Sequence, residues 1–138
     1  MSSPCLLDTC AAIWISKREP LAPDAMAYLA RSRAQGVPAF VSSVTAWEMA
    51  ILMSKGRMRE TKTAGRWHCD FMSEGGFAEQ PVTTATFIAS CFLPEPLHRD
   101  PFDRMLIATA REHDLTIITR DRAILAYGAA GHVRTLAC

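Results

Sequence analysis

The sequence predicts an α/β domain spanning residues 1–138, with a mostly parallel central sheet and helices on both faces. Two observations lead to this fold class. Short apolar or β-branched segments, which are typical of strands, alternate with segments of helical periodicity throughout the chain. Hydrophobic residues make up 49 % of the 138 positions, which suits one domain of ordinary size. Ligand sites in such sheets lie at the carboxyl ends of the strands.

The first half of the chain predicts two strands and four helices. The strands are residues 4–8 and residues 39–42, both short and apolar. A helix over 23–34 is supported by the spacing of its apolar residues and is ended by Gly36-Val37-Pro38. The other helices are expected at 11–15, 44–56 and, more weakly, 66–74.

The second half repeats the alternation. A strand over 77–82 is weakened by Pro81 and is followed by a helix over 84–92. Pro101 opens the next helix, which runs to about residue 113. The next element is a strand over 115–119. It is the clearest strand of the chain, because its residues are apolar and β-branched. The last two elements are expected to be a short helix over 121–128 and a strand over 132–136.

Four acidic residues lie where predicted strands give way to helices. Asp8 ends the first strand, and Glu48 lies one turn into the helix after the second. Asp103 is in the first turn of the helix that Pro101 opens, and Asp121 follows the 115–119 strand by two residues. The fold therefore predicts that all four carboxylates gather at one edge of the sheet.

A purely structural role is the alternative for each acid. An Asp between a strand and a helix is often an N-cap, which fits Asp8, Asp121 and Asp100. The segment 45–48, TAWE, matches a capping box, in which Glu48 would stabilise the helix start. For any one of these acids taken alone, the sequence does not decide between a structural cap and a functional site residue.

The neighbours of Glu48 and Asp103 favour a functional role. Both acids have apolar residues at helical spacing, so both are expected to point inward, where a carboxylate is costly unless it is paired or binds a metal. Four clustered carboxylates repel one another and would take up protons or recruit a cation. An all-oxygen cluster suits Mg²⁺ or Mn²⁺, which can activate water and stabilise charge at phosphorus.

The net charge of +1 gives no overall basic footprint, so only local clusters can indicate a nucleic-acid partner. Basic residues gather in the segment 55–66 and around the last two acids. They could position phosphates around an acidic pit, or simply form a solvated face with local ion pairs. The candidates for RNA binding are Lys55, Arg57, Arg59, Lys62, Arg104 and Arg120.

Several other classes of protein are disfavoured. The five cysteines are odd in number and lack a C-x-x-C spacing, which argues against a disulfide framework or a zinc ribbon. No glycine-rich phosphate loop occurs, and no four-histidine or histidine–cysteine spacing suggests a metal site. No signal peptide or membrane span is recognisable, so a soluble cytoplasmic protein is expected. The tryptophans are expected in the core or an interface rather than as base-stacking platforms: Trp14, Trp47 and Trp67.

Four segments together resemble the PIN-domain family, and more closely the VapC-type toxins of bacterial toxin–antitoxin operons. In chain order they are LLDTCAAIW, SSVTAWEMAILMSKGRM, HRDPFDRMLIATA and IITRDRAI. The resemblance runs from about residue 5 to residue 137, and DPFDR followed by an apolar helix is its most specific part. It implies a single PIN-like domain with Mg²⁺- or Mn²⁺-dependent endoribonuclease activity.

The resemblance also implies roles for particular residues. Asp8 and Asp103 would be the principal metal ligands, with Glu48 and Asp121 completing the catalytic pocket directly or through water. The hydroxyls of Thr9 and Thr119 would line it. Metal-activated water would attack the phosphodiester and leave a 5′-phosphate and a 3′-hydroxyl. One departure is Cys10, next to Asp8, where relatives often carry His, Asn or Ser.

The family implies three kinds of partner: a tRNA or ribosomal RNA substrate, a second copy of the chain in a homodimer, and a VapB-like antitoxin. Such an antitoxin lays a peptide over the toxin and can push a basic side chain into the acidic site. Apolar helix residues near Ile13, Trp14 and Met26 are candidates for its groove. The choice of RNA, the choice of metal and the number of ions remain open.

Other functions are less well supported. A non-catalytic RNA- or protein-binding module on the same fold is the main alternative, and the presence of all four acids counts against it. A phosphatase of the haloacid-dehalogenase type needs a second Asp two positions after the first, where this chain has Cys10. A response-regulator receiver needs a Lys after a late strand, where this chain has Arg120.

Overall fold

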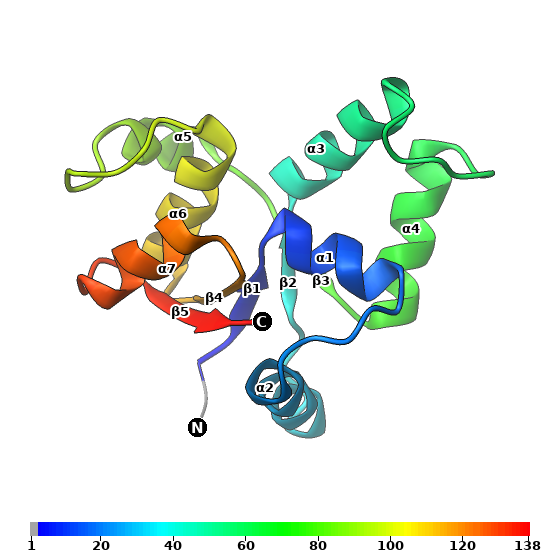
Figure 1. The fold of residues 1–138 in the computed structure, drawn as a ribbon, viewed down its shortest axis with the longest axis horizontal. Helices are drawn as coiled ribbons and strands as arrows, with labels where there is room; N and C mark the ends of the chain where they lie inside the picture. The colour runs from blue at the N-terminus through cyan, green and yellow to red at the C-terminus, as the bar shows by residue number, and fades with distance from the viewer. Residues whose placement is uncertain (1–2) are drawn as a thin grey trace.

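Five short parallel strands form one sheet in the computed structural model of the chain, which describes residues 3–138 (Figure 1). Their order across the sheet is β3-β2-β1-β4-β5, and every neighbouring pair is parallel. The predicted α/β class is therefore confirmed. The strands are β1 (Cys5–Leu7), β2 (Phe40–Ser42), β3 (Ala78–Gln80), β4 (Thr116–Thr119) and β5 (Arg134–Ala137).

Seven helices within the described residues connect the strands and cover both faces of the sheet (Figure 1). They are α1 (Thr9–Ser16), α2 (Pro23–Ala34), α3 (Ser43–Ser54), α4 (Ala64–Gly75), α5 (Thr84–Cys91), α6 (Pro101–His113) and α7 (Arg122–Ala129).

The largest departures from the predicted boundaries are explained by capping and turn geometry. Helix α1 begins at Thr9, two residues early, because the Asp8 side chain accepts a hydrogen bond from the backbone N–H of Ala11. Thr63 caps α4 in the same way, so that helix also begins two residues early. The last strand is β5 rather than 132–136, because the chain still turns through Gly131 at φ 91°.

Successive strand residues face opposite sides of the sheet and build two cores. Leu7 and Ile118 pack with α1, α2 and α4, whereas Leu6 and Ile117 pack with α6 and α7. All four of these side chains are fully buried. This burial on both faces explains why the strands β1 and β4 are continuous apolar runs rather than alternating ones.

The topology places β1 in the middle of the sheet. The chain moves from β1 to β2 and β3 on one side, then returns to pair β4 with the other side of β1. The carboxyl ends of β1 and β4 thus form the switch point at which open parallel sheets usually bind ligands. Over residues 3–138, no helix has the length and apolarity needed to cross a membrane.

Candidate functional site

Asp8 and Asp121 are brought together at the carboxyl ends of β1 and β4 by one threonine. Asp8 is only 4 % exposed, and its Oδ1 accepts a hydrogen bond of 2.7 Å from the backbone N–H of Ala11. Its Oδ2 accepts a hydrogen bond from the hydroxyl of Thr119. The same Thr119 oxygen accepts the backbone N–H of Asp121 at 2.9 Å. Thr119 therefore holds the two acidic segments in register.

Glu48 reaches the site from α3 and faces α1. Its Oε1 accepts a hydrogen bond of 2.6 Å from the hydroxyl of Thr9, which also lies 3.0 Å from the hydroxyl of Thr45. The capping-box interpretation is wrong, because α3 begins earlier and Ser42 caps it by accepting the backbone N–H of Val44. Glu48 is thus free of a capping role and is oriented by Thr9.

Asp103 lies on the first turn of α6, beside a histidine that the sequence did not indicate. The Nε2 atom of His98 is 3.3 Å from Oδ2 of Asp103. One possible ligand atom from each of His98, Asp103 and Asp121 lies within 4.8 Å of the other two. No spacing motif includes His98, and its position two residues before the helix cap Asp100 was the only available signal.

The capping alternative holds for three aspartates, yet it does not exclude a second role. Asp8, Asp100 and Asp121 cap α1, α6 and α7 respectively through their side chains. Each cap uses one carboxylate oxygen, Oδ1, as acceptor. The second oxygen of each of these caps is left for another partner, and in Asp8 that partner is Thr119.

The acids are close enough to disturb one another's protonation. Burial, followed by the negative charges of Asp100, Asp121, Glu48 and Asp8, raises the pKa of Asp103 to about 7. Burial also raises the pKa of Asp8 and of Glu48, although their hydrogen bonds from Thr119 and Thr9 oppose the change. The cluster therefore favours protons or a cation that neutralises it.

Cys10 lies beside the acids, as the sequence indicated. Desolvation and then the charges of Asp8, Glu48, Asp103 and Asp121 raise the pKa of its thiol to about 11. The thiol is therefore protonated at neutral pH and is a poor nucleophile and metal ligand in that form.

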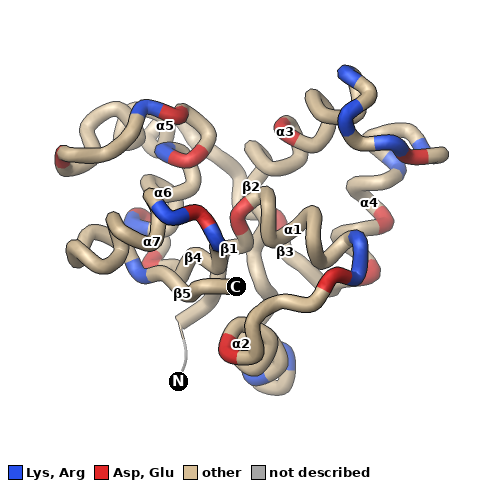
Figure 2. Tube along the Cα trace, in the orientation of Figure 1, with Lys and Arg blue, Asp and Glu red and all other residues tan. Residues whose placement is uncertain are grey.

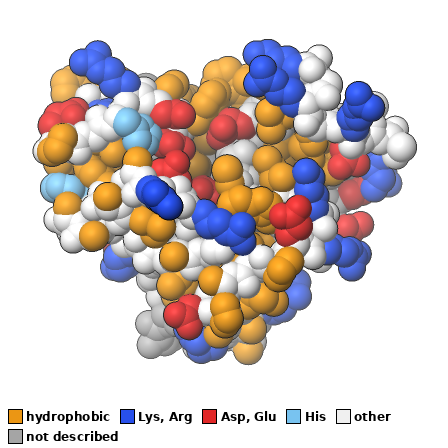
Figure 3. Space-filling view, in the orientation of Figure 1, with side chains coloured by type: hydrophobic (Ala, Val, Ile, Leu, Met, Phe, Trp, Pro, Cys, Tyr) orange, Lys and Arg blue, Asp and Glu red, His pale blue; other side chains and the backbone are white. Residues whose placement is uncertain are grey.

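The basic segment after α3 is exposed. Lys55, Arg57 and Arg59 lie on the connection between α3 and α4, where Figure 2 shows several basic positions in succession. Lys62 pairs instead with Asp70, at 2.6 Å. Figure 3 shows acidic side chains gathered in the hollow between two lobes, with basic side chains on the rim.

Two of the predicted RNA-binding arginines are occupied by structural contacts. Arg104 is 11 % exposed in its side chain and donates hydrogen bonds to the carbonyls of Ser90 and His98. Arg120 donates to the carbonyls of Cys138 and Pro20 and stacks 3.7 Å from the ring centroid of Trp14. Both guanidinium groups donate to backbone carbonyls, so the proposed RNA-binding surface does not include Arg104 or Arg120.

The tryptophans do not share one environment. Trp67 is buried and stacks on Phe71, as expected of a core residue. Trp47 is 55 % exposed, so of the two predicted settings, core or interface, it does not occupy the core. It makes an edge-to-face contact with Phe102, the residue before Asp103, with their ring centroids 5.0 Å apart.

The donor atoms fit a hard divalent cation. Asp8, Glu48, Asp103 and Asp121 supply carboxylate oxygens, the ligand type that Mg²⁺ and Mn²⁺ prefer. Burial and, after it, repulsion from the neighbouring acids raise the pKa of Asp103, and a bound cation would offset both. Carboxylate oxygens of Asp103 and Asp121 already lie within 4.8 Å of each other, which fits one such ion between them.

Comparison with known proteins identifies the family. The PIN domain family matches residues 5–129. Among curated proteins, none matches the chain significantly in sequence.

Several solved structures share the fold. A chain of VapBC2 from Rickettsia felis, bound to a promoter DNA fragment, is 14 % identical, with 96 % of each chain covered and a TM-score of 0.69. A chain of FitAB bound to an IR36 DNA fragment is 19 % identical, with coverages of 96 % and 94 % and a TM-score of 0.66. FitAcB from Neisseria gonorrhoeae is 20 % identical, with 96 % of each chain covered and a TM-score of 0.61.

At these identities the structural likenesses show the fold, and the family match covers most of the chain. PIN domains as a class are nucleases that generally use divalent metal ions. This chain, with its acidic cluster at the carboxyl ends of a parallel sheet, belongs to the PIN-domain family.

Proposed function

We propose that the chain is a metal-dependent endoribonuclease and the toxin of a toxin–antitoxin pair, cleaving RNA phosphodiesters with metal-activated water. The observation that carries this proposal is the gathering of Asp8, Glu48, Asp103 and Asp121 at one edge of the sheet. Burial and, after it, the neighbouring negative charges raise the pKa of Asp103 to about 7, and a bound cation would offset both effects.

Each acidic residue has a distinct part in the proposed site. Asp8 and Asp103 would be the principal ligands of Mg²⁺ or Mn²⁺, and Glu48 and Asp121 would bind directly or through water. A bound ion would activate water and neutralise charge that develops at the phosphorus. Thr119 orients Asp8, and Thr9 orients Glu48.

The exposed basic segment would position the RNA backbone. Lys55, Arg57 and Arg59 lie on the rim formed by the α3–α4 connection, and phosphate contacts of this kind fix the position of a strand without reading its sequence. We assign Lys62 a smaller role, because it is paired with Asp70.

A cleavage assay tests the proposal. The purified chain, free of any antitoxin, is incubated with total bacterial RNA and Mg²⁺, and the products are mapped by their 5′ ends. We expect discrete 5′-phosphate ends that disappear in EDTA and in Asp103→Asn. The matched control is Asp24→Asn, which changes an exposed Asp in the first turn of α2 and should cleave normally.

The outcomes separate the alternatives. Ends that persist in EDTA would point to a metal-independent mechanism and refute the site. If the folded chain binds RNA across a wide set of substrates without cutting any of them, it is a non-catalytic RNA-binding module on the same fold.

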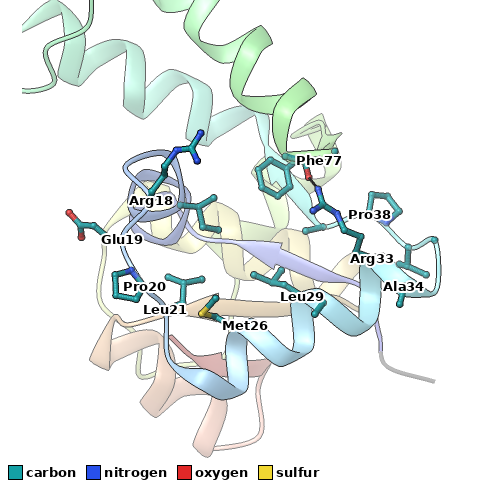
Figure 4. A pocket seen from close by; sticks show the side chains of 17 residues that line it. Arg18, Glu19, Pro20, Leu21, Met26, Leu29, Arg33, Ala34, Pro38 and Phe77 are labelled. Carbon is teal, nitrogen blue, oxygen red and sulfur yellow. Dashed lines mark hydrogen bonds between the residues drawn. The ribbon is translucent and has the colours of Figure 1, made fainter.

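An apolar groove is the candidate docking surface for the proposed antitoxin. A groove with a volume of about 980 Å³ lies beside α2, and apolar side chains including Leu21, Met26, Leu29 and Phe77 line it (Figure 4). Met26 was among the residues expected to form such a surface, whereas Ile13 and Trp14 do not line this groove. Support also comes from the solved neighbours, several of which are described as VapBC or FitAB complexes.

We expect Met26→Glu to weaken inhibition by the proposed VapB-like antitoxin without changing RNA cleavage. Met26 is 53 % exposed, so the substitution places a charge in the groove at little cost to folding. Asp24→Asn again serves as control. Equal inhibition of both variants would remove the groove from the proposal.

We also propose a homodimer. The support is a set of exposed apolar side chains on and just after α5: Phe87 at 46 %, Ile88 at 58 % and Phe92 at 82 %. Light scattering tests this directly, and a monomeric mass at micromolar concentration would contradict it.

A further inference from the structure

The ring of His98 makes two contacts that together define its role. Its Nδ1 atom accepts a hydrogen bond of 3.2 Å from the backbone N–H of Asp100. Its Nε2 atom lies 3.3 Å from Oδ2 of Asp103. The imidazole thus bridges the N-cap of α6 and the acid one turn into the same helix.

The first contact determines where the ring proton lies. An Nδ1 atom that accepts an N–H cannot carry a proton itself, so the proton of the neutral ring is on Nε2. The nearest oxygen of the Asp103 carboxylate, Oδ2, is 3.3 Å from that nitrogen. An Nε2 atom that carries a proton has no lone pair for a metal, although His98 stands among the possible ligands with Asp103 and Asp121.

We propose that His98 is a positioning residue, not a metal ligand: its Nε2–H donates to Oδ2 of Asp103 and leaves the other carboxylate oxygen for the cation. The inference rests on the proposed function, in which Asp103 is a ligand. A ligand carboxylate held by a hydrogen bond from a neighbouring group is a common arrangement around metal ions. Such bonds are often long before the site is loaded, in keeping with 3.3 Å.

A neighbouring arginine keeps the histidine in place. Arg104 follows Asp103 in the chain but points the other way, donating to the carbonyls of His98 at 3.1 Å and Ser90 at 2.8 Å. It also lies 3.5 Å from a carboxylate oxygen of Glu95. Of these two adjacent residues of α6, Asp103 lies in the site, and Arg104 binds the loop that contains His98.

The imidazole supplies one of several contacts that hold the loop, its hydrogen bond from the backbone N–H of Asp100. Arg104 ties the backbone of the loop down, and the backbone N–H of Leu97 donates to Glu95 at 3.0 Å. The side chain of His98 remains 32 % exposed, so it adds little to the core. A structural role alone therefore leaves the approach of Nε2 to Asp103 unexplained.

The tautomer can be measured directly. ¹⁵N NMR of the histidine rings at pH 8, with His98→Ala used for assignment, distinguishes a protonated nitrogen from an unprotonated one. We expect His98 to carry its proton on Nε2 in the metal-free chain and to keep it there when Mg²⁺ is added. A proton on Nδ1, or loss of the Nε2 proton on adding Mg²⁺, would overturn the proposal.

Metal affinity supplies the second measurement. We expect His98→Ala to weaken Mn²⁺ binding, followed by calorimetry, by about tenfold, and His98→Gln, which keeps a side-chain N–H donor, to recover most of it. The matched control is His113→Ala, because His113 also lies 3.3 Å from a carboxylate, that of Glu112, at the opposite end of α6 from Asp103. Unchanged affinity in a folded His98→Ala variant, or no recovery with Gln, would refute the positioning role.

The two proposals fail in different ways. A wild-type chain that binds neither Mg²⁺ nor Mn²⁺ refutes the proposed function. In that case the ring tautomer of the metal-free chain still decides whether His98 donates to Asp103.

Discussion

At the scale of single residues, one buried hydroxyl organises the centre of the site. Thr119 is fully buried, donates to Asp8 and accepts from the backbone of Asp121. Its oxygen therefore links the ends of two adjacent strands and sets the distance between two acids. A side chain of the same shape without the hydroxyl would leave both partners unsatisfied.

We expect Thr119→Val to lower the free energy of unfolding by about 1–3 kcal/mol, the usual cost of unsatisfied buried polar groups. RNA cleavage should fall as well, because Asp8 loses the hydrogen bond that orients it. Thr109→Val is the control: Thr109 is equally buried, but its hydroxyl donates only to the Met105 carbonyl of its own helix. Urea titration compares the two, and equal losses of stability and activity would contradict the special role of Thr119.

Asp103 should make the stability of the metal-free chain depend on pH. Its pKa is about 7 in the folded chain, against an ordinary value of 3.8, so between these values the folded state binds more protons than the unfolded state. The free energy of unfolding must then fall as pH rises from about 4 to 7. We expect Asp103→Asn to reduce this slope, to which Asp8 and Glu48 also contribute, and to be more stable than wild type at pH 8 by on the order of 1–2 kcal/mol.

Thermal unfolding at several pH values in EDTA measures this effect. Adding Mg²⁺ at pH 8 should raise the Tm of the wild type, because the cation offsets the same repulsion. A wild type that is most stable above pH 7 without metal would contradict the assignment.

At the scale of elements, the segment DPFDR shows how one helix start combines several roles. Asp100 caps α6, Pro101 occupies its first position, Asp103 faces the site and Arg104 clamps the preceding loop. Since residues three apart lie on one face of a helix, the cap and the site acid stay close together. The loop and the site should therefore lose order together.

We expect Arg104→Gln to destabilise the chain by about 2 kcal/mol, because charge-assisted hydrogen bonds to buried carbonyls are lost. Amide hydrogen exchange should speed up in residues 92–99 more than elsewhere. The control is Arg99→Gln, an exposed arginine of the same loop, which should change stability by less than about 0.5 kcal/mol. Uniform exchange across the chain would argue against a local clamp.

The sequence predicted the elements well and the contacts of side chains less well. Apolar periodicity predicts nearly every helix and strand. Asp8 and Asp121 each follow a predicted strand, which was enough to place both at the carboxyl edge of the sheet. The roles of Arg104 and His98 depend on which way a loop folds back, which no local pattern encodes. The supposed capping box failed because Ser42, three residues before Thr45, was the better cap in three dimensions.

At the scale of the whole molecule, a local separation of charge exists although the net charge is only +1. On the face shown in Figure 3, acidic side chains gather in the hollow and basic ones lie on its rim. In the proposed function, the basic rim would hold the RNA backbone while one phosphodiester lies at the acidic cluster. The affinity for RNA should then fall as the salt concentration rises, because each contact between a basic side chain and a phosphate releases counterions.

We expect the double variant Arg57→Gln, Arg59→Gln to reduce the salt dependence of RNA affinity. Two lost contacts lower the slope of log K against log[salt] by about 1–1.5. Binding is measured in an Asp103→Asn background, so that the RNA stays intact. The same change at Arg31 and Arg33, a pair in the last turn of α2, is the control. Equal slopes for both pairs would show that the α3–α4 segment holds no phosphate.

The central position of β1 has a consequence for the order in which the chain matures during synthesis. Strand β1 is synthesised well before its neighbour β4, and Thr119 meets Asp8 across 111 positions of sequence. Contacts so distant in sequence form late, since the intervening chain must be closed into a loop first. A growing chain that lacks β4 holds Asp8 and Glu48 but neither Thr119 nor Asp121. For the ribonuclease proposed above, this order predicts that an incomplete chain without β4 does not cleave RNA.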